Sequence, residues 1–318
     1  MKENRIFSSL LLVLSALLAL SACNRPDDGP RHLTPEEIEQ YKKQQTVKIE
    51  KYVEYRQGNC PIILTVPHGG TVVESFLTLR NTSNCPDPDF ATDLDYNTRE
   101  LADEIDKAFF QQTGKHPYMI IALIKRNHVD FNRRRNYAIP AGDENVGKIY
   151  DAYHEYVAKA RSEVSQQYGH GLLLDIHGQS HSEQIDLGYL LPVSTLNLSD
   201  EKLNSGTYAA SSSIAYLTRT NKAGLSFAQL LRGEKSFGGI LYKNGLECVP
   251  RPQNLSPGNT PYFYGGYTTR IYGSYGGGVV DAIQCEFRYS YRDTQSERLR
   301  CAAAFAKSID AFTKVVWE

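Results

Sequence analysis

Two histidines that each follow an apolar run are the residues of this 318-residue chain best suited to bind a metal ion. His177 ends the run 172–177, and His68 comes directly after the run 61–67. Buried strands of open α/β proteins bring the residues at their carboxyl ends to one edge of a sheet. Asp175 could fix the tautomer of His177, as carboxylates do for metal-bound imidazoles. The pattern predicts a shared metal site; the alternative is a pair of strand-end histidines that only hydrogen-bond backbone carbonyls.

A third ligand is needed, because catalytic zinc takes three protein ligands and leaves one position for water. The wide spacing of the two histidines argues against a zinc finger, whose ligands come in short-spaced pairs. Asp93 and Asp95 lie where a helix over 94–112 is predicted to begin. Either could be the acidic ligand, although aspartate at a helix start also caps free N–H groups. Glu74, six residues after His68, is the competing candidate.

A glutamate in a strand-like segment near the end of the chain could act as a general base. In the segment 279–288, alternation places Gln284 and Glu286 on one face. A carboxylate in an apolar strand is costly unless it is paired or used. Glu286 beside a metal-bound water would suit a zinc hydrolase, and a structural glutamate–arginine pair is the alternative.

The basic segment 126–135 follows another strand-like run, 117–124, and contains Arg126, Asn132 and Arg133. Guanidinium groups bind carboxylates in a bidentate manner, and a neighbouring amide can add a hydrogen bond. The segment therefore predicts an anion-binding site, with a solvated basic loop as the alternative. His128 within it is expected to be structural rather than a metal ligand.

The amino terminus predicts export. Lys2 and Arg5 precede an apolar run over 7–20 that is short for a membrane span, as in a secretory signal peptide. The segment Leu20-Ser21-Ala22-Cys23 resembles a bacterial lipobox. We expect a signal peptide over 1–22, lipidation of Cys23 and a polar tether over 23–51. The protein would then be a periplasmic or outer-membrane-anchored lipoprotein, and the alternative is a secreted protein. The lipid would be its only attachment to a membrane.

The charge and the cysteines bear on nucleic-acid binding and on disulfides. The net charge of −1 gives no basic surface for nucleic acid. An oxidising compartment permits disulfides, and Cys60 with Cys85 is the pair expected to form one.

Strand-like runs alternate with helical patterns over 94–112, 146–168 and 296–316, while 192–278 is rich in loops with one helical stretch near 225–234. This alternation predicts a single α/β domain over 52–318, with a mixed or largely parallel sheet covered on both faces.

Several of these motifs, in this order, resemble the N-formylglutamate amidohydrolase family, which belongs with the zinc carboxypeptidases and aspartoacylases. They are Pro67-His68-Gly69-Gly70, Asp93-x-Asp95-Tyr96, Arg126-x-x-x-Asp130-Phe131-Asn132-Arg133, Leu174-Asp175-Ile176-His177-Gly178 and Gly265-Gly266-Tyr267-x-x-Arg270. The similarity runs from about residue 52 to 310. The chain departs from the carboxypeptidase His-x-x-Glu motif, because Thr71 occupies the glutamate position.

The resemblance implies a three-layer αβα fold like that of zinc carboxypeptidases and one Zn²⁺ ion per chain. It implies that His68, Asp95 and His177 bind the zinc, that Glu286 is the general base, and that a substrate carboxylate is held by four residues: Arg126, Asn132, Arg133 and Arg270. The expected activity is hydrolysis of an N-acyl amino acid or a similar small substrate with a carboxylate. The alternatives are a carboxypeptidase-like peptidase of the cell envelope and a binding lipoprotein without turnover.

Overall fold

The computed structural model describes Thr34, Glu36 and residues 47–318. The predicted signal peptide, the lipidation site at Cys23 and most of the tether lie outside these residues. From Val47 onward the described chain belongs to one compact unit. Across the described ranges, no helix combines the length and the apolar character that a membrane span requires.

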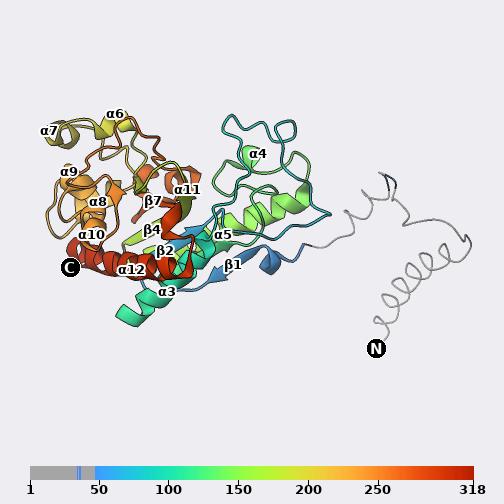
Figure 1. The fold of residues 1–318 in the computed structure, drawn as a ribbon, viewed down its shortest axis with the longest axis horizontal. Coiled ribbons are helices and arrows are strands. Elements are labelled where there is room, and N and C mark those ends of the chain that lie inside the picture. Colours follow the sequence, from blue (N-terminus) through green and yellow to red (C-terminus); the bar gives the residue numbers. More distant parts are fainter. Residues whose placement is uncertain (1–33, 35, 37–46) are drawn as a thin grey trace, which may run out of the picture. The chain divides into compact units, whose positions relative to one another are not determined.

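A mixed sheet of seven strands forms the centre of this unit, in the order β1-β3-β2-β4-β7-β5-β6 (Figure 1). The four strands β3, β2, β4 and β7 are parallel to one another, whereas β1 and β5 are antiparallel to their inner neighbours. The short β6 pairs in parallel with β5. The strands are β1 (Val53–Arg56), β2 (Ile62–Val66), β3 (Tyr118–Ala122), β4 (Gly171–Gln179), β5 (Ile185–Gly188), β6 (Cys248–Val249) and β7 (Val280–Arg288). The predicted α/β class with a mixed, mostly parallel sheet is confirmed.

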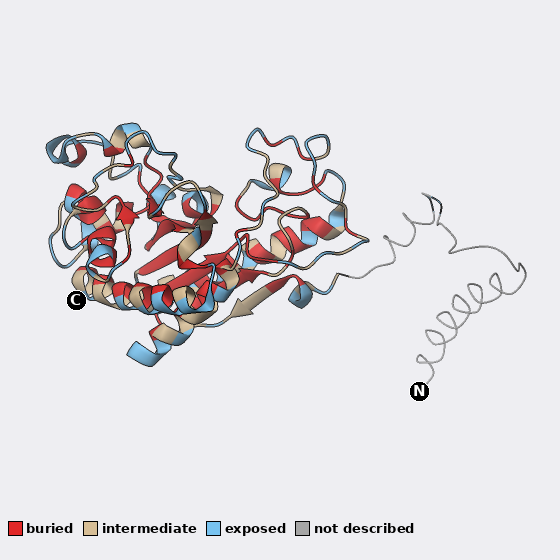
Figure 2. Ribbon diagram, viewed as in Figure 1, coloured by how far each residue is buried: buried red, intermediate tan, exposed pale blue. Residues whose placement is uncertain are grey.

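Helices cover both faces of the sheet, and the central strands between them are almost entirely buried (Figure 2). Helices α3 (Thr98–Thr113) and α12 (Gln295–Trp317) pack against one face. Helix α5 (Glu144–Tyr168) packs against the other. Strand β2 shows why: Ile62 and Leu64 join the core under α3, and Ile63 between them joins the core under α5. Apolar residues therefore fill both faces of a strand, as a sheet with two helical layers requires.

The helix predicted over 94–112 begins later than expected, at Thr98. Asn97 has φ 60° in the left-handed region, so the helix cannot extend through it towards the amino terminus. Asp95 consequently lies in the loop before α3, where its carbonyl accepts a hydrogen bond from Thr98 Oγ1 at 2.8 Å. Its side chain does not cap the helix and is available for another role.

The loop-rich segment 192–278 contains more helix than the sequence predicts. The predicted stretch near 225–234 is α9 (Phe227–Arg232), and the additional helices are all short. They are α6 (Val193–Leu196), α7 (Asp200–Asn204), α8 (Ala215–Thr220), α10 (Phe237–Lys243) and α11 (Tyr267–Tyr272). The same segment contains a short 3-10 helix, η2 (Ser274–Gly276). Elsewhere, the structure adds α4 (Arg135–Ala138) and two further 3-10 helices, η1 (Ile49–Lys51) and η3 (Tyr289–Tyr291). Helices of one or two turns leave too little periodicity to be read from the sequence.

The predicted disulfide between Cys60 and Cys85 is wrong. Both thiols are free and buried, as are those of Cys248, Cys285 and Cys301. Cys60 Sγ donates to the carbonyl of His116 at 3.2 Å, and Cys85 Sγ donates to the carbonyl of Tyr137 at 2.6 Å. Each cysteine is thus packed against a different segment, and proximity in sequence to the His68 strand does not bring them together.

Candidate metal centre and active site

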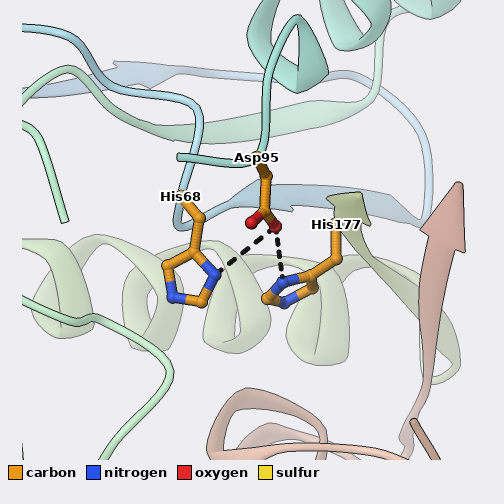
Figure 3. A group of neighbouring side chains, drawn as sticks. All are labelled: His68, Asp95 and His177. Atoms are coloured by element: carbon orange, nitrogen blue, oxygen red, sulfur yellow. Dashed lines mark hydrogen bonds and ion pairs between the residues drawn. The ribbon is translucent and has the colours of Figure 1, made fainter. Parts of the chain in front are cut away.

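His68, Asp95 and His177 converge at the carboxyl edge of the sheet (Figure 3). His68 lies just after β2, His177 lies in the adjacent β4, and Asp95 comes from the loop before α3. Asp95 Oδ2 is 3.5 Å from His68 Nδ1 and 3.3 Å from His177 Nδ1. Ligand atoms about 2.1 Å from a tetrahedral zinc ion are about 3.4 Å apart, so the observed separations suit such an ion. This buried cluster could bind a metal ion.

A buried carboxylate holds the outer nitrogen of each imidazole. Asp130 Oδ1 is 2.7 Å from His68 Nε2, and Asp175 Oδ2 is 3.0 Å from His177 Nε2. Thr65 Oγ1 donates to the other oxygen of Asp175 at 2.7 Å. With a metal ion bound, these contacts would favour the tautomer that carries its proton on Nε2 and would leave the Nδ1 lone pair of each ring for the ion. Metal-bound histidines in proteins are commonly oriented by such carboxylates. The contact of Asp175 with His177 fits the expectation that Asp175 fixes the tautomer of this ring.

The electrostatics of the cluster favour a cation. Burial acts to raise the pKa of Asp95, but His68 and His177 outweigh it and hold that pKa below its ordinary value. Burial acts to lower the pKa of His177, but Asp175 and Glu286 outweigh it and raise that pKa well above its ordinary value. Positive charge is therefore strongly stabilised between these residues, and a divalent metal ion would supply it.

Glu286 lies beside the cluster, on the neighbouring strand β7. Strands β4 and β7 pair in parallel with His177 opposite Glu286. Glu286 Oε1 is 3.9 Å from His177 Nδ1 and accepts a hydrogen bond from Gln284 Nε2 at 2.8 Å. Burial raises the pKa of Glu286 to about 8. A carboxyl group whose pKa is near neutrality, next to a metal site, is suited to general acid–base catalysis.

The ligand cluster and Glu286 line a cavity of about 1040 Å³. The structure brings the four predicted substrate-binding residues to the wall of the same cavity: Arg126, Asn132, Arg133 and Arg270. Arg126 Nε donates to Asp130 Oδ2 at 2.8 Å, and Arg133 Nε donates to Asp87 Oδ2 at 2.8 Å. Arg270 is exposed, with its guanidinium 5.3 Å from the ring centre of Tyr275.

Asn132 is packed into the site rather than projecting freely into the cavity. Its Nδ2 lies 3.3 Å from His177 Nε2, and its Oδ1 accepts a hydrogen bond from Thr268 N at 2.9 Å. A Cβ atom on Gly266 would lie 2.3 Å from Asn132 Nδ2. The Gly-Gly-Tyr segment therefore needs glycine at this position to approach Asn132 closely.

The competing candidates for the acidic ligand lie elsewhere. Glu74 forms an ion pair with Lys51 and does not line the cavity. Asp93 is exposed on the cavity wall, outside the ligand cluster. His128 Nε2 lies 3.3 Å from the backbone nitrogen of Glu74, which fits the structural role expected for this histidine.

The cavity wall also contains residues that the sequence analysis does not single out, and Arg292 and His181 are two of them. Arg292 is buried and donates to the backbone carbonyls of Tyr96, Gln179 and Phe287. A Cβ atom on Gly178 would lie 2.3 Å from its Cζ, so the small residue after His177 makes room for this guanidinium. His181 is held by Asp186, with 2.9 Å between Nε2 and Oδ2. Both residues lie in loops without periodicity, and the glycine after Asp-x-His was the only available signal.

Comparison with known proteins gives distant structural similarities. No family model matches the chain, and no curated protein matches it. The gene product Atu2144 from Agrobacterium tumefaciens is similar at 12% identity and a TM-score of 0.49, covering 84% of this chain and 97% of its own. N-formylglutamate amidohydrolase from Ralstonia eutropha JMP134 is similar at 12% identity and a TM-score of 0.47, covering 83% and 98%. A bacteriophage poly-γ-glutamate hydrolase is similar at 14% identity and a TM-score of 0.41, covering 88% and 96%.

Proposed function

We propose that the protein is a zinc-dependent hydrolase of amide bonds that acts on an N-acyl amino acid or a similar small substrate with a carboxylate. One observation carries the proposal: the buried carboxyl of Glu286 lies 3.9 Å from His177 Nδ1, beside the His68–Asp95–His177 cluster. A site that only binds a metal ion does not need a desolvated carboxyl group beside its three ligands. A hydrolase needs it to activate water.

Zinc is the metal that we propose for this cluster. Two imidazoles and one carboxylate are a ligand set of catalytic zinc sites, which keep a further position open. The same set also occurs in non-haem iron oxygenases. The position of Glu286 favours hydrolysis over oxygen chemistry, because a proton acceptor beside the open position serves an attacking water.

The proposed mechanism assigns one task to each group. A bound zinc ion would polarise the scissile carbonyl and acidify water. Glu286 takes a proton from the attacking water, and Gln284 Nε2 fixes the orientation of its carboxylate. Asp130 and Asp175 keep the two imidazoles in the tautomer that binds metal. Arg126, Arg133 and Arg270 in the cavity wall hold the carboxylate of the substrate, so that binding energy is used for orientation.

A carboxypeptidase-like activity on peptides is the second candidate. The cavity of about 1040 Å³ is larger than an N-acyl amino acid requires. Four aromatic residues on its wall have exposed side chains that could contact further residues of a peptide: Tyr96, Phe263, Tyr264 and Tyr289. A panel of N-acyl amino acids and of peptides with free or amidated carboxyl ends would separate the two substrate classes.

The test of the function combines metal content with turnover. The purified protein is expected to contain about one zinc per chain, to hydrolyse at least one member of the panel, and to lose activity with a chelator. Addition of zinc should restore the activity. Zinc-free protein that hydrolyses the panel at the same rate would refute the proposal.

We further propose that the chain is an exported lipoprotein of the cell envelope. The sequence Leu20-Ser21-Ala22-Cys23 after an apolar run supports lipidation of Cys23. Membrane fractionation tests this: the wild type should sediment with membranes, and Cys23→Ala should become soluble or remain unprocessed. A wild-type protein found only in the soluble fraction would contradict the anchor and favour secretion.

A further inference from the structure

A third imidazole–carboxylate pair lies in the cavity wall, and its carboxylate is one strand beyond Glu286. His181 Nε2 is 2.9 Å from Asp186 Oδ2. The side chain of His181 is 21% exposed and lines the cavity, whereas that of Asp186 is only 1% exposed. A buried carboxylate therefore holds an imidazole that faces the space in which a substrate would bind.

The surrounding loop fixes this pair in place. Gln179 Oε1 accepts a hydrogen bond from the backbone of His181 at 2.7 Å, and Gln179 Nε2 donates to the carbonyl of Gln184 at 2.7 Å. The ring of Phe263 packs edge-on against His181, with 5.0 Å between centroids, and Phe263 N donates to Asp186 Oδ2 at 3.3 Å. Asp186 Oδ1 is buried without a hydrogen-bond partner among the described residues. Burial of such an oxygen costs free energy, which argues that the pair is not there for packing alone.

Strand register places the pair relative to the metal cluster. His177 on β4 is opposite Glu286 on β7, and Glu286 is opposite Asp186 on β5. Residues directly opposite one another project from the same face of a sheet, and neighbouring strands are about 4.8 Å apart. A metal ligand, the base and the carboxylate that holds His181 therefore form one row across three neighbouring strands.

Amide hydrolysis needs two proton transfers, one from the attacking water and one to the leaving nitrogen. Glu286 is placed for the first, next to the cluster. For the second, a donor is needed further along the substrate. Among the described residues, no hydrogen bond reaches Nδ1 of His181, since Asp186 engages only Nε2. Nδ1 is thus the nitrogen of this ring that is available to a substrate.

We propose that protonated His181 donates its Nδ1 proton to the leaving nitrogen and that Asp186 positions the ring; this rests on the proposed function. A C–O bond forms to the attacking water, whose proton goes to Glu286. The C–N bond breaks, its electron pair stays on nitrogen, and that nitrogen takes the proton of His181. Glu286 then releases its proton to solvent, and His181 takes one from solvent, so the cycle balances.

The test compares two substrates with the same acyl group and a carboxylate in each leaving group. One is the amide that the wild type hydrolyses, and the other is the thioester of 3-mercaptopropionate, whose thiolate leaves without a proton. For His181→Gln, kcat on the amide should fall at least about 100-fold, and kcat on the thioester should change less than about 5-fold. Asp186→Asn should show the same selectivity with a smaller loss.

Controls separate this role from others. The imidazole of His116 is also held by an aspartate, with 2.7 Å between His116 Nδ1 and Asp106 Oδ1, but it lies outside the cavity wall. The control variant His116→Gln should therefore alter neither rate. Added imidazole should restore amide hydrolysis in His181→Ala, which serves if the glutamine variant is unstable. Equal loss on both substrates, a change confined to KM, or unchanged amide turnover would overturn the proposal. A wild type that hydrolyses neither any amide of the panel nor the thioester would instead refute the proposed function.

Discussion

His68 Nε2 lies 2.7 Å from Asp130 Oδ1, and this carboxylate is completely buried. The contact makes the metal-facing nitrogen of His68 depend on a residue that is not itself a ligand. Asp130→Asn keeps the shape of the side chain but weakens the pull on the Nε2 proton. We expect the affinity for zinc to fall about 10- to 100-fold, measured by competition with a chromogenic chelator. Asp87→Asn, which removes the partner of Arg133, is the control and should leave the affinity unchanged.

Glu286→Gln should separate metal binding from turnover. Glutamine has nearly the same size and can still contact Gln284, but it cannot accept a proton from water. We expect kcat to fall about 10²- to 10⁴-fold, while zinc content and thermal stability stay close to the wild type. Asp93→Asn, on the exposed cavity wall, is the matched control. Full activity of Glu286→Gln would exclude this residue as the base.

Zinc should stabilise the fold through His177. A ligand that binds only the folded state raises the free energy of unfolding of the protein. At high ligand concentration, this increase grows with the logarithm of the ratio of ligand concentration to Kd. After chelation, the wild type should therefore melt at a lower temperature and recover when zinc is added. His177→Ala should hold no zinc by elemental analysis and should not respond to added zinc. A zinc-dependent melting temperature in this variant would show that the ion binds elsewhere.

Asp281 should make stability depend on pH. It is buried on β7, accepts hydrogen bonds from Ser274 Oγ and Leu217 N, and burial raises its pKa from 3.8 to about 7. The fold thus favours the neutral acid: this stabilisation is complete below about pH 4 and is lost as the pH rises through 7. Asp281→Asn stays neutral, so its stability relative to the wild type should grow between pH 4 and 8, by up to about 4 kcal/mol. Urea unfolding at several pH values measures this, and parallel curves would contradict it.

Gly178 should tolerate no side chain. Alanine would place its Cβ 2.3 Å from Arg292 Cζ, so the buried guanidinium would have to move. We expect Gly178→Ala to cost about 1–3 kcal/mol of stability and to lower activity, because Arg292 lines the cavity. Gly276→Ala is the control, since a Cβ there meets no atom within 4 Å. Equal stability of the two variants, measured by urea unfolding, would contradict the close packing.

The sequence predicted the parts of the site that depend on a strand and its last residues. The runs before His68 and within 172–177 are apolar at successive positions, which indicates strands buried on both faces. Parallel neighbours then bring their carboxyl ends together, and β2, β4 and β7 do so. Glu286 could be singled out because a carboxylate in such a strand is unusual.

The parts that were missed depend on contacts between distant segments. The antiparallel pairing of β5 with β7 puts Asp186 beside Glu286, and no local pattern specifies that register. The guanidinium of Arg292 binds carbonyls from three separate segments. Helix α3 begins later than the sequence predicts because Asn97 takes a left-handed conformation, which asparagine adopts only in some contexts.

The row His177–Glu286–Asp186 has a consequence for how this chain can change in evolution. Because successive side chains of a strand point to opposite faces, inserting or deleting one residue within β7 would turn Glu286 away from both neighbours. We expect selection to remove such insertions and deletions in β4, β5 or β7, even where the protein still folds. The short helices and loops over 192–245 supply no residue of the row, so length variation should accumulate there.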